Sequence, residues 1–198
     1  MSTPTRTPTL KVIVTSTREQ RAGRAIAQWF VERARQDGRF AVELVDLKEV
    51  ALPLLDEPTL PMKRDYQQAH TRAWSAIVDG ADAFVFVVPE YNFGMPPALL
   101  NAIDYLYHEW SYKPAAFVSY GGVSGGTRSV QMAKSVLTSV KVMPIPEAVT
   151  LPLFVKQLDG AGTFAPGDAH DRSVTTMLGE LLRWATALAP LRDSAARA

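Results

Sequence analysis

Residues 83–88 read Ala-Phe-Val-Phe-Val-Val, an uninterrupted apolar run rich in β-branched and aromatic side chains. Such a run is typical of a strand buried on both faces, because a half-exposed strand alternates apolar and polar residues. A shorter run of the same kind occupies residues 10–14. We therefore predict that both segments are central strands of a sheet whose two faces are covered.

Strand-like and helix-like segments alternate about five times along the rest of the chain. Parallel strands need crossover connections, usually helices, so this alternation predicts an α/β fold with a parallel sheet and helices on both faces. In open sheets of this kind, ligands bind beyond the carboxyl ends of the strands. The further predicted strands are 40–47, 115–119 and 142–151, and the predicted helices lie around 26–34, 65–78, 96–110, 130–140 and 174–185.

Composition narrows the class of protein. The 198 residues are 47% hydrophobic and fit one domain. The 21 Lys and Arg against 20 Asp and Glu give a net charge of +1, which provides no electrostatic reason to expect nucleic acid or an anionic membrane as a partner. The chain has no cysteine, which excludes thiolate catalysis and disulfides and fits a cytoplasmic location. We expect no signal peptide and no membrane helix.

The loop after the first strand, residues 15–24, is rich in hydroxyl and guanidinium groups and runs into a predicted helix. Backbone N–H groups at a helix start, together with Ser16, Thr17, Arg18 and Arg21, suit a phosphate. The loop matches neither the dinucleotide-binding glycine pattern nor a P-loop. A solvated loop whose hydroxyl caps the helix is the alternative.

The loop after the third strand, residues 89–97, combines an aromatic ring, an amide and restrained backbone. These groups could hold the edge and face of a flat heterocycle. Prolines, asparagine and glycine also build ordinary turns into helices, so a turn without a ligand is the alternative.

The loop after the fourth strand, residues 119–126, is rich in glycine and would let the backbone approach a ligand closely. Residues 122–126 also satisfy the G-x-S-x-G pattern of a serine hydrolase, with Ser124 as nucleophile and His170 as the partner later in the chain. The three histidines show no paired ligand spacing, so no metal site is expected.

Together the three loops resemble those of the NADPH-dependent FMN reductase family. The matching segments are Ser16-Thr17-Arg18 with Gly23, Pro89-Glu90-Tyr91-Asn92-Phe93-Gly94, and residues 119–126. The Pro-Glu-Tyr-Asn segment followed by the helix from Pro97 is the most specific part. The resemblance covers roughly residues 10–155 and implies a flavodoxin-like three-layer sandwich with a five-stranded parallel sheet in the order 2-1-3-4-5.

The resemblance also implies where FMN binds. Ser16, Arg18 and the backbone around residues 21–23 would hold the phosphate, and residues 89–92 would flank the isoalloxazine, with residues 119–122 at its other edge. Many relatives carry Ser and Asn where this chain has Arg21 and Gly23, which favours backbone or guanidinium contacts there. The full set expected at FMN is Ser16, Thr17, Arg18, Arg21, Ala22, Gly23, Pro89, Glu90, Tyr91, Asn92, Phe93, Ser119, Gly121 and Gly122.

The implied activity is transfer of hydride from NADPH or NADH through FMN to a small-molecule acceptor: a quinone, an azo compound, a metal oxyanion or free flavin. The serine hydrolase and a non-enzymatic electron carrier are the competing hypotheses, although flavodoxins proper are usually strongly acidic. Residues 1–9 are expected to form a disordered arm, 10–190 the FMN-binding domain and 191–198 a frayed tail. A homodimer or homotetramer is expected, since Leu54, Leu55, Leu100 and Tyr107 add apolar surface that a monomer could cover only by packing it under its own loops.

Overall fold

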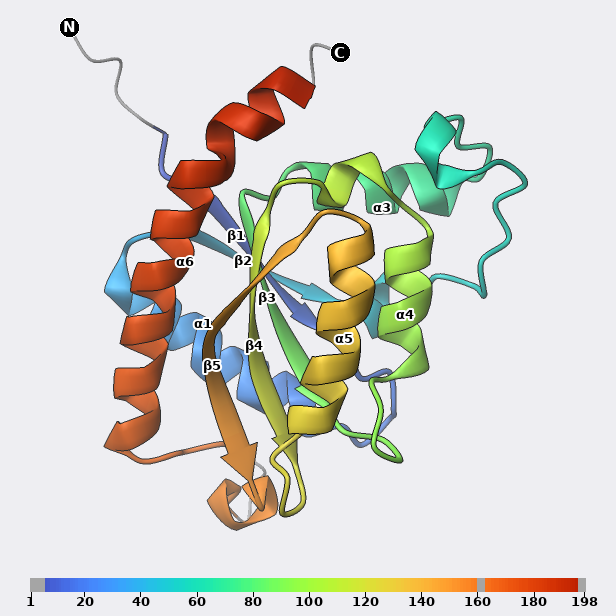
Figure 1. Ribbon diagram of the computed structural model, residues 1–198. Coiled ribbons are helices and arrows are strands. Elements are labelled where there is room, and N and C mark those ends of the chain that lie inside the picture. Colours follow the sequence, from blue (N-terminus) through green and yellow to red (C-terminus); the bar gives the residue numbers. More distant parts are fainter. Residues whose placement is uncertain (1–5, 160–162, 196–198) are drawn as a thin grey trace, which may run out of the picture.

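The computed structural model describes residues 6–159 and 163–195, and it confirms the predicted sheet. All neighbouring strands are parallel, in the order β2-β1-β3-β4-β5 (Figure 1). This is the flavodoxin-like order. The strands are β1 (Thr9–Val14), β2 (Ala41–Asp46), β3 (Ala83–Pro89), β4 (Pro114–Gly121) and β5 (Met143–Pro152).

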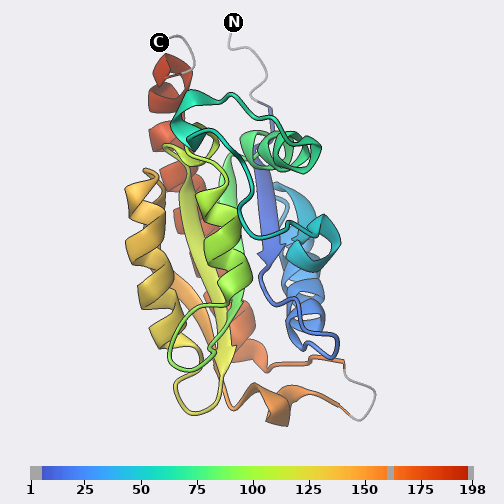
Figure 2. The same cartoon turned by 90° about the vertical axis from the view of Figure 1, so that its right-hand side faces the viewer.

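Helices cover both faces of the sheet and create two cores (Figure 2). One face is covered by α1 (Gly23–Asp37) and α6 (Asp168–Ala195). The other is covered by α3 (Ala69–Asp79), α4 (Pro97–Asp104) and α5 (Thr127–Ser139). Every residue of β1, β3 and β4 is buried, whereas edge strand β2 is exposed over much of its length, as expected from its alternating sequence.

Two predicted helical boundaries are wrong. The helix expected over 96–110 ends at Asp104, because two buried indoles hydrogen-bond to its last carbonyl groups. The Trp74 Nε1–H donates to the Ala102 carbonyl (2.8 Å), and the Trp110 Nε1–H donates to the Ile103 carbonyl (3.2 Å). A short 3₁₀ helix, His108–Trp110, follows. The helix expected from residue 65 begins at Ala69, because the Glu57 carboxylate accepts the N–H groups of the two preceding glutamines.

The loop expected over residues 51–62 is irregular for most of its length, but short helices flank it. Helix α2 (Leu47–Val50) precedes it, with Asp46 accepting from the Lys48 N–H as its cap. A 3₁₀ turn, Pro61–Lys63, lies at its end. A further 3₁₀ turn, Phe154–Gln157, follows β5.

The two ends of the chain differ from the expected arm and tail. Arg6 pairs with Asp82 (2.7 Å), and Thr9 already belongs to β1. Helix α6 passes through Pro190 and continues to Ala195. Residues 1–5 and 196–198, the remainder of the expected arm and tail, lie outside the described residues. No helix in the described part is both long and apolar enough to cross a membrane.

Candidate functional site

The loops after β1, β3 and β4 meet at the carboxyl edge of the sheet, as the topology requires. Together with the segment after β5 they enclose a cavity of about 390 Å³. Nine of the predicted site residues line it: Ser16, Arg18, Arg21, Ala22, Pro89, Glu90, Tyr91, Gly121 and Gly122. The cavity therefore brings together residues separated by more than a hundred positions in the sequence.

The loop after β1 gives the cavity a positive end. Arg21 forms an ion pair with Asp46 (2.5 Å between Nη2 and Oδ2), and the Asp46 side chain is almost fully buried. Arg24 contacts the same carboxylate (3.0 Å between Nη1 and Oδ2). Glu19 is paired with Lys48 (2.5 Å). Within the described part of the chain, the exposed Arg18 side chain has no ion-pair or hydrogen-bond partner. Its charge is therefore available to an anionic ligand, as a phosphate-binding loop requires.

Arg21 offers a second donor at the same end. Asp46 holds one terminal nitrogen of its guanidinium, while Nε is buried without a hydrogen-bond partner in the described residues. Buried donors are normally satisfied, so an unpaired one at a cavity wall suggests that a ligand completes the site. An anionic oxygen is the acceptor that matches this donor.

Hydroxyl groups gather between the positive end and the strands. Ser16 is buried, and its Oγ lies 2.6 Å from the Tyr91 hydroxyl. Tyr120, at the end of β4, is also buried and lines the cavity. Burial and the neighbouring Tyr91 hydroxyl raise the pKa of Tyr120, while a hydrogen bond with Ser16 opposes the rise. The Tyr120 hydroxyl is therefore protonated at neutral pH and can donate a hydrogen bond.

The loop after β3 is a tight two-residue hairpin. Tyr91 and Gly94 exchange backbone hydrogen bonds of 3.0 and 2.9 Å, and Asn92 and Phe93 at the tip have φ values of 49° and 66°. A left-handed phenylalanine is strained by about 1 kcal/mol or more, a feature that concentrates at functional sites. Neither tip residue lines the cavity, in contrast to the prediction.

Glu90 fastens this hairpin to the start of α5. Its carboxylate accepts from Ser124 Oγ (2.9 Å), from the Arg128 backbone N–H (3.2 Å) and from the Arg128 guanidinium (2.7 Å). Burial tends to raise the pKa of Glu90, but these hydrogen bonds outweigh it and hold the pKa below its usual value. The Arg128 guanidinium also stacks 3.9 Å from the Phe93 ring centroid. The Glu90 side chain thus braces two walls of the cavity.

The loop after β4 presents backbone to the cavity at Gly121 and Gly122. Gly126 closes the loop with φ 88°, and a Cβ there would lie 2.8 Å from the Tyr120 nitrogen, so only glycine fits. Ser119 does not line the cavity; its side chain is buried with Oγ unpaired in the described residues.

Four lining residues were missing from the predicted set: Gln20, Tyr120, Phe154 and Leu158. Phe154 and Leu158 follow β5, and the Phe154 ring packs edge-on against Tyr120 at 5.1 Å. The rule that pointed to the other loops, namely that ligands bind at the carboxyl ends of parallel strands, would also have pointed to this segment.

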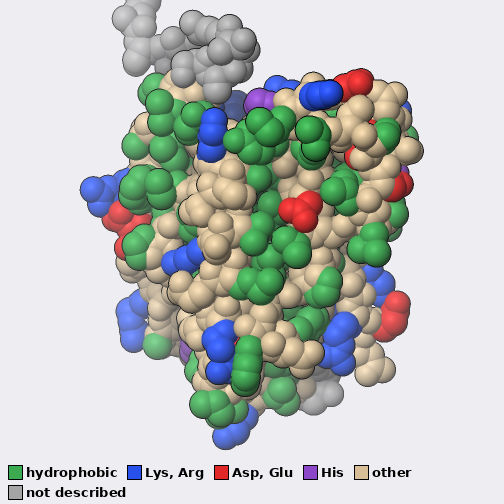
Figure 3. Space-filling model, turned by 45° about the vertical axis from the view of Figure 1, so that its right-hand side comes forward, with side chains coloured by type: hydrophobic (Ala, Val, Ile, Leu, Met, Phe, Trp, Pro, Cys, Tyr) green, Lys and Arg blue, Asp and Glu red, His purple; other side chains and the backbone are tan. Residues whose placement is uncertain are grey.

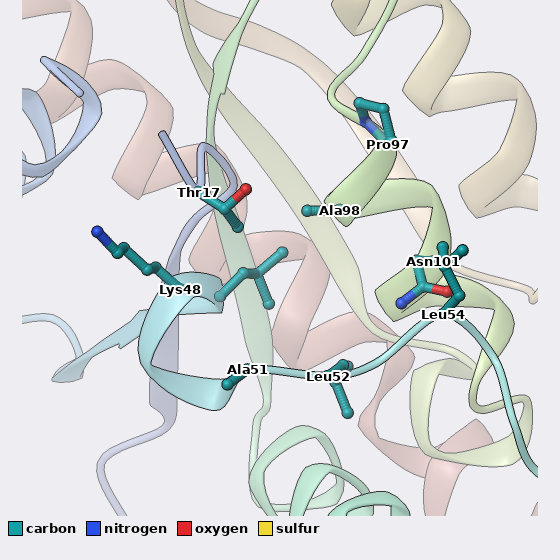
Figure 4. Close-up of a pocket in the computed structure, with 9 residues that line it drawn as sticks. Thr17, Lys48, Ala51, Leu52, Leu54, Pro97, Ala98 and Asn101 are labelled. Atoms are coloured by element: carbon teal, nitrogen blue, oxygen red, sulfur yellow. The ribbon is translucent and has the colours of Figure 1, made fainter. Parts of the chain in front are cut away.

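Thr17 faces a different hollow. It lies with α2, residues 51–54 and the start of α4 around a groove of about 470 Å³ (Figure 4). We call this the α2–α4 groove. It is lined by Thr17, Leu47, Lys48, Ala51, Leu52, Leu54, Pro97, Ala98 and Asn101. The loop after β1 therefore separates two hollows, with Ser16 and Arg18 facing the cavity and Thr17 facing the α2–α4 groove.

The structure does not support the serine hydrolase. Ser124 Oγ donates to the Glu90 carboxylate, and within the described residues it makes no hydrogen bond with His170. The Nδ1 atom of His170 is buried with no hydrogen-bond partner in the described residues, so no carboxylate orients this ring as a triad requires. The described segments also contain no group of three or more His, Cys, Asp or Glu suited to a metal ion.

Comparisons with known proteins agree with the geometry. The family model described as NADPH-dependent FMN reductase matches residues 8–156. An NAD(P)H-dependent FMN reductase of Schizosaccharomyces pombe is 45% identical over 149 residues, which is 74% of each chain. A quinone reductase of Pseudomonas putida is 32% identical over 148 residues, 69% of this chain and 74% of the relative.

Solved structures support the fold. The flavoenzyme NAD(P)H:acceptor oxidoreductase FerB of Paracoccus denitrificans superposes with a TM-score of 0.70 at 20% identity, covering 91% of this chain and 98% of that one. The sequence matches confirm the expected enzyme class, an oxidoreductase that uses FMN and NAD(P)H. This chain belongs to the NADPH-dependent FMN reductase family.

Proposed function

We propose that the protein binds FMN in the cavity at the carboxyl edge of the sheet and transfers hydride from NAD(P)H to a small-molecule acceptor. The observation that carries the proposal is the polarity of this cavity. One end has Arg18 and the Nε of Arg21, neither of which has a partner among the described residues, and the remaining walls are backbone and aromatic surface. A flat ring system with a phosphate at one end matches both parts.

The residues fit the parts of FMN in a definite order. Arg18, Arg21 and Ser16 are the donors for the phosphate, and the start of α1 adds the favourable end of a helix dipole. Pro89 and Tyr91 on one side and the Gly121–Gly122 backbone on the other would flank the ring system. The Glu90 brace keeps these two walls at a fixed separation before any ligand arrives.

When bound, FMN supplies the centre that accepts hydride from NAD(P)H and passes two electrons to the acceptor. The protein contributes binding, orientation and exclusion of water. No side chain has to act as a nucleophile in this scheme, which agrees with the use of Ser124 as a structural hydrogen-bond donor. Since the nicotinamide and the acceptor use the same open face, we expect ping-pong kinetics.

The acceptor classes that we propose are quinones, azo compounds, metal oxyanions and free flavin. A relative of 30% identity is an NADPH azoreductase of a Bacillus species, and the relative from Pseudomonas putida is a quinone reductase. The apolar side chains of Phe154 and Leu158 at the cavity favour flat, apolar acceptors over hydrated oxyanions. We also propose a cytoplasmic location, where NAD(P)H is regenerated.

We further propose that the protein works as a homodimer or homotetramer. Leu54 beside the α2–α4 groove is 83% exposed, and Leu55 is 45% exposed. Leu100 and Tyr107 are already half-buried against the protein's own core, so the proposal rests on the loop after α2 and on the groove. Hydrophobic side chains gather in a band down the face that carries α4 and α5 (Figure 3). A second copy seated on the α2–α4 groove would lie against Thr17, next to the phosphate end of the FMN cavity.

The central experiment is a flavin titration of the purified protein. We expect a yellow protein, or stoichiometric uptake of FMN with quenching of its fluorescence, and NAD(P)H-dependent reduction of a simple quinone. A colourless protein that neither quenches FMN fluorescence nor oxidises NAD(P)H in the presence of FMN and quinone would overturn the proposal.

A further inference from the structure

Tyr120 is placed in a way that core packing alone does not explain. It stands near the end of β4, between the predicted site residues Ser119 and Gly121, and its side chain is 4% exposed. The ring packs against Phe154, yet the residue also lines the FMN cavity. A buried phenol at a cavity wall brings a polar group to the ligand that a phenylalanine would not.

The hydroxyl of Tyr120 occupies the space that a side chain on Gly23 would fill. A Cβ added to Gly23 would lie 2.5 Å from Tyr120 Oη, whereas the ring carbon Cζ would be at an ordinary 3.4 Å. Gly23 begins α1 and has no left-handed φ, so its backbone does not require glycine. Alanine is the better helix former at such a position. We therefore read Gly23 as the residue that makes room for the Tyr120 hydroxyl.

This places the hydroxyl among the groups proposed to hold phosphate. It lies at the start of α1, where Ser16 and the positive charges of Arg21 and Arg18 act on it. These are the same three side chains that form the polar end of the cavity. Because burial keeps the phenol protonated, its proton is available for donation to an anionic oxygen.

We propose that Tyr120 is a further phosphate-binding residue, and that Gly23 and Tyr120 work as a pair in which the absent side chain of one positions the hydroxyl of the other. This proposal rests on the proposed binding of FMN in the same cavity. A hydrogen-bond donor for the phosphate at the start of α1 would thus come from a side chain near the end of β4.

The first test compares FMN with riboflavin, which lacks the phosphate, in fluorescence titrations of Tyr120→Phe. This variant keeps the ring and its contact with Phe154 and removes only the hydroxyl. A hydrogen bond to a charged acceptor predicts a loss of about tenfold or more in FMN affinity with little change for riboflavin. The matched control is Tyr66→Phe, which removes a hydroxyl bonded to Glu109 outside the cavity and should leave the ratio of the two affinities unchanged.

The second test is a double-mutant cycle with Gly23→Ala. In the native background the new methyl group displaces the Tyr120 hydroxyl, so FMN affinity and the melting temperature of the flavin-free protein should both fall. In the Tyr120→Phe background the nearest atom is the ring carbon, so the same substitution should cost little in either measurement. Additive effects would show that the two residues do not work as a pair.

The outcomes separate the two proposals. A native protein that binds neither flavin refutes FMN binding itself. A native protein that binds FMN, combined with a Tyr120→Phe variant that loses equally for both flavins or loses nothing, refutes only the role of Tyr120.

Discussion

Replacing Arg18 by alanine should weaken FMN binding without weakening the fold. The Arg18 side chain is exposed and has no partner in the described residues, so the flavin-free protein loses no interaction. In the complex, a guanidinium–phosphate contact of this kind contributes on the order of 1.5–3 kcal/mol. The expected loss is therefore roughly ten- to a hundredfold in FMN affinity.

Arg21 provides the contrast, because its charge is already used in the flavin-free protein. Removing it leaves the Asp46 carboxylate, whose side chain is 1% exposed, with Arg24 as its remaining cationic partner. An incompletely paired buried carboxylate costs about 1–3 kcal/mol. We therefore expect Arg21→Ala to lower both FMN affinity and the free energy of unfolding, whereas Arg18→Ala lowers FMN affinity alone.

The assay is a set of fluorescence titrations with FMN and riboflavin at low and high salt, combined with urea denaturation of each flavin-free variant. Arg18→Lys should lose less than Arg18→Ala, since it keeps the charge but not the planar fork. Part of the loss should disappear at high salt, where the attraction between exposed charges is screened. Equal losses for FMN and riboflavin, or a destabilised Arg18→Ala protein, would refute the assignment of Arg18 to the phosphate.

Three further outcomes are expected. Ser124→Ala should leave NAD(P)H-dependent quinone reduction largely intact, because Ser124 only donates to Glu90; ester hydrolysis that disappears with this substitution would restore the hydrolase. Burial lowers the pKa of Lys113 from 10.5 to about 8, so between these pH values the unfolded chain binds a proton that the folded protein does not. The free energy of unfolding should therefore rise with pH, by about 2 kcal/mol from pH 8 to pH 10 relative to Lys113→Met in denaturation curves. A difference between the two proteins that is independent of pH would contradict this. Light scattering at micromolar concentration should show an oligomer that Leu54→Asp dissociates, and a fully active native monomer of about 21.7 kDa would contradict the proposed assembly.

Local patterns in the chain account for the sheet and for the position of the site. The apolar runs at residues 10–14 and 83–88 predicted the two central strands, because only a strand covered on both faces tolerates such runs. Helices between the strands then required parallel neighbours, and parallel strands end at one edge. Nine lining residues followed from that edge and from the family resemblance.

Side-chain partners could not be read from the sequence, because they depend on contacts between distant segments. The local sequence does not show that Asp46 pairs with Arg21, while Arg18 has no side-chain partner in the described residues. Nor does it show that Glu90 pairs with Arg128 and therefore faces α5. The helix expected as far as residue 110 ends at Asp104 for a related reason: the indole of Trp74, from another helix, and that of Trp110 donate to its last carbonyls.

The sequence by itself determined the order of strands and helices, the edge of the sheet where the cavity forms and the family of the protein, since each depends on hydrophobic periodicity or on short contiguous motifs. The tertiary structure alone decided which groups in that cavity are free to bind. The clearest example is Gly23 with Tyr120: they lie 97 positions apart and in different elements, and only the packing of α1 against the end of β4 brings the phenol hydroxyl into the space that a side chain on the helix would fill.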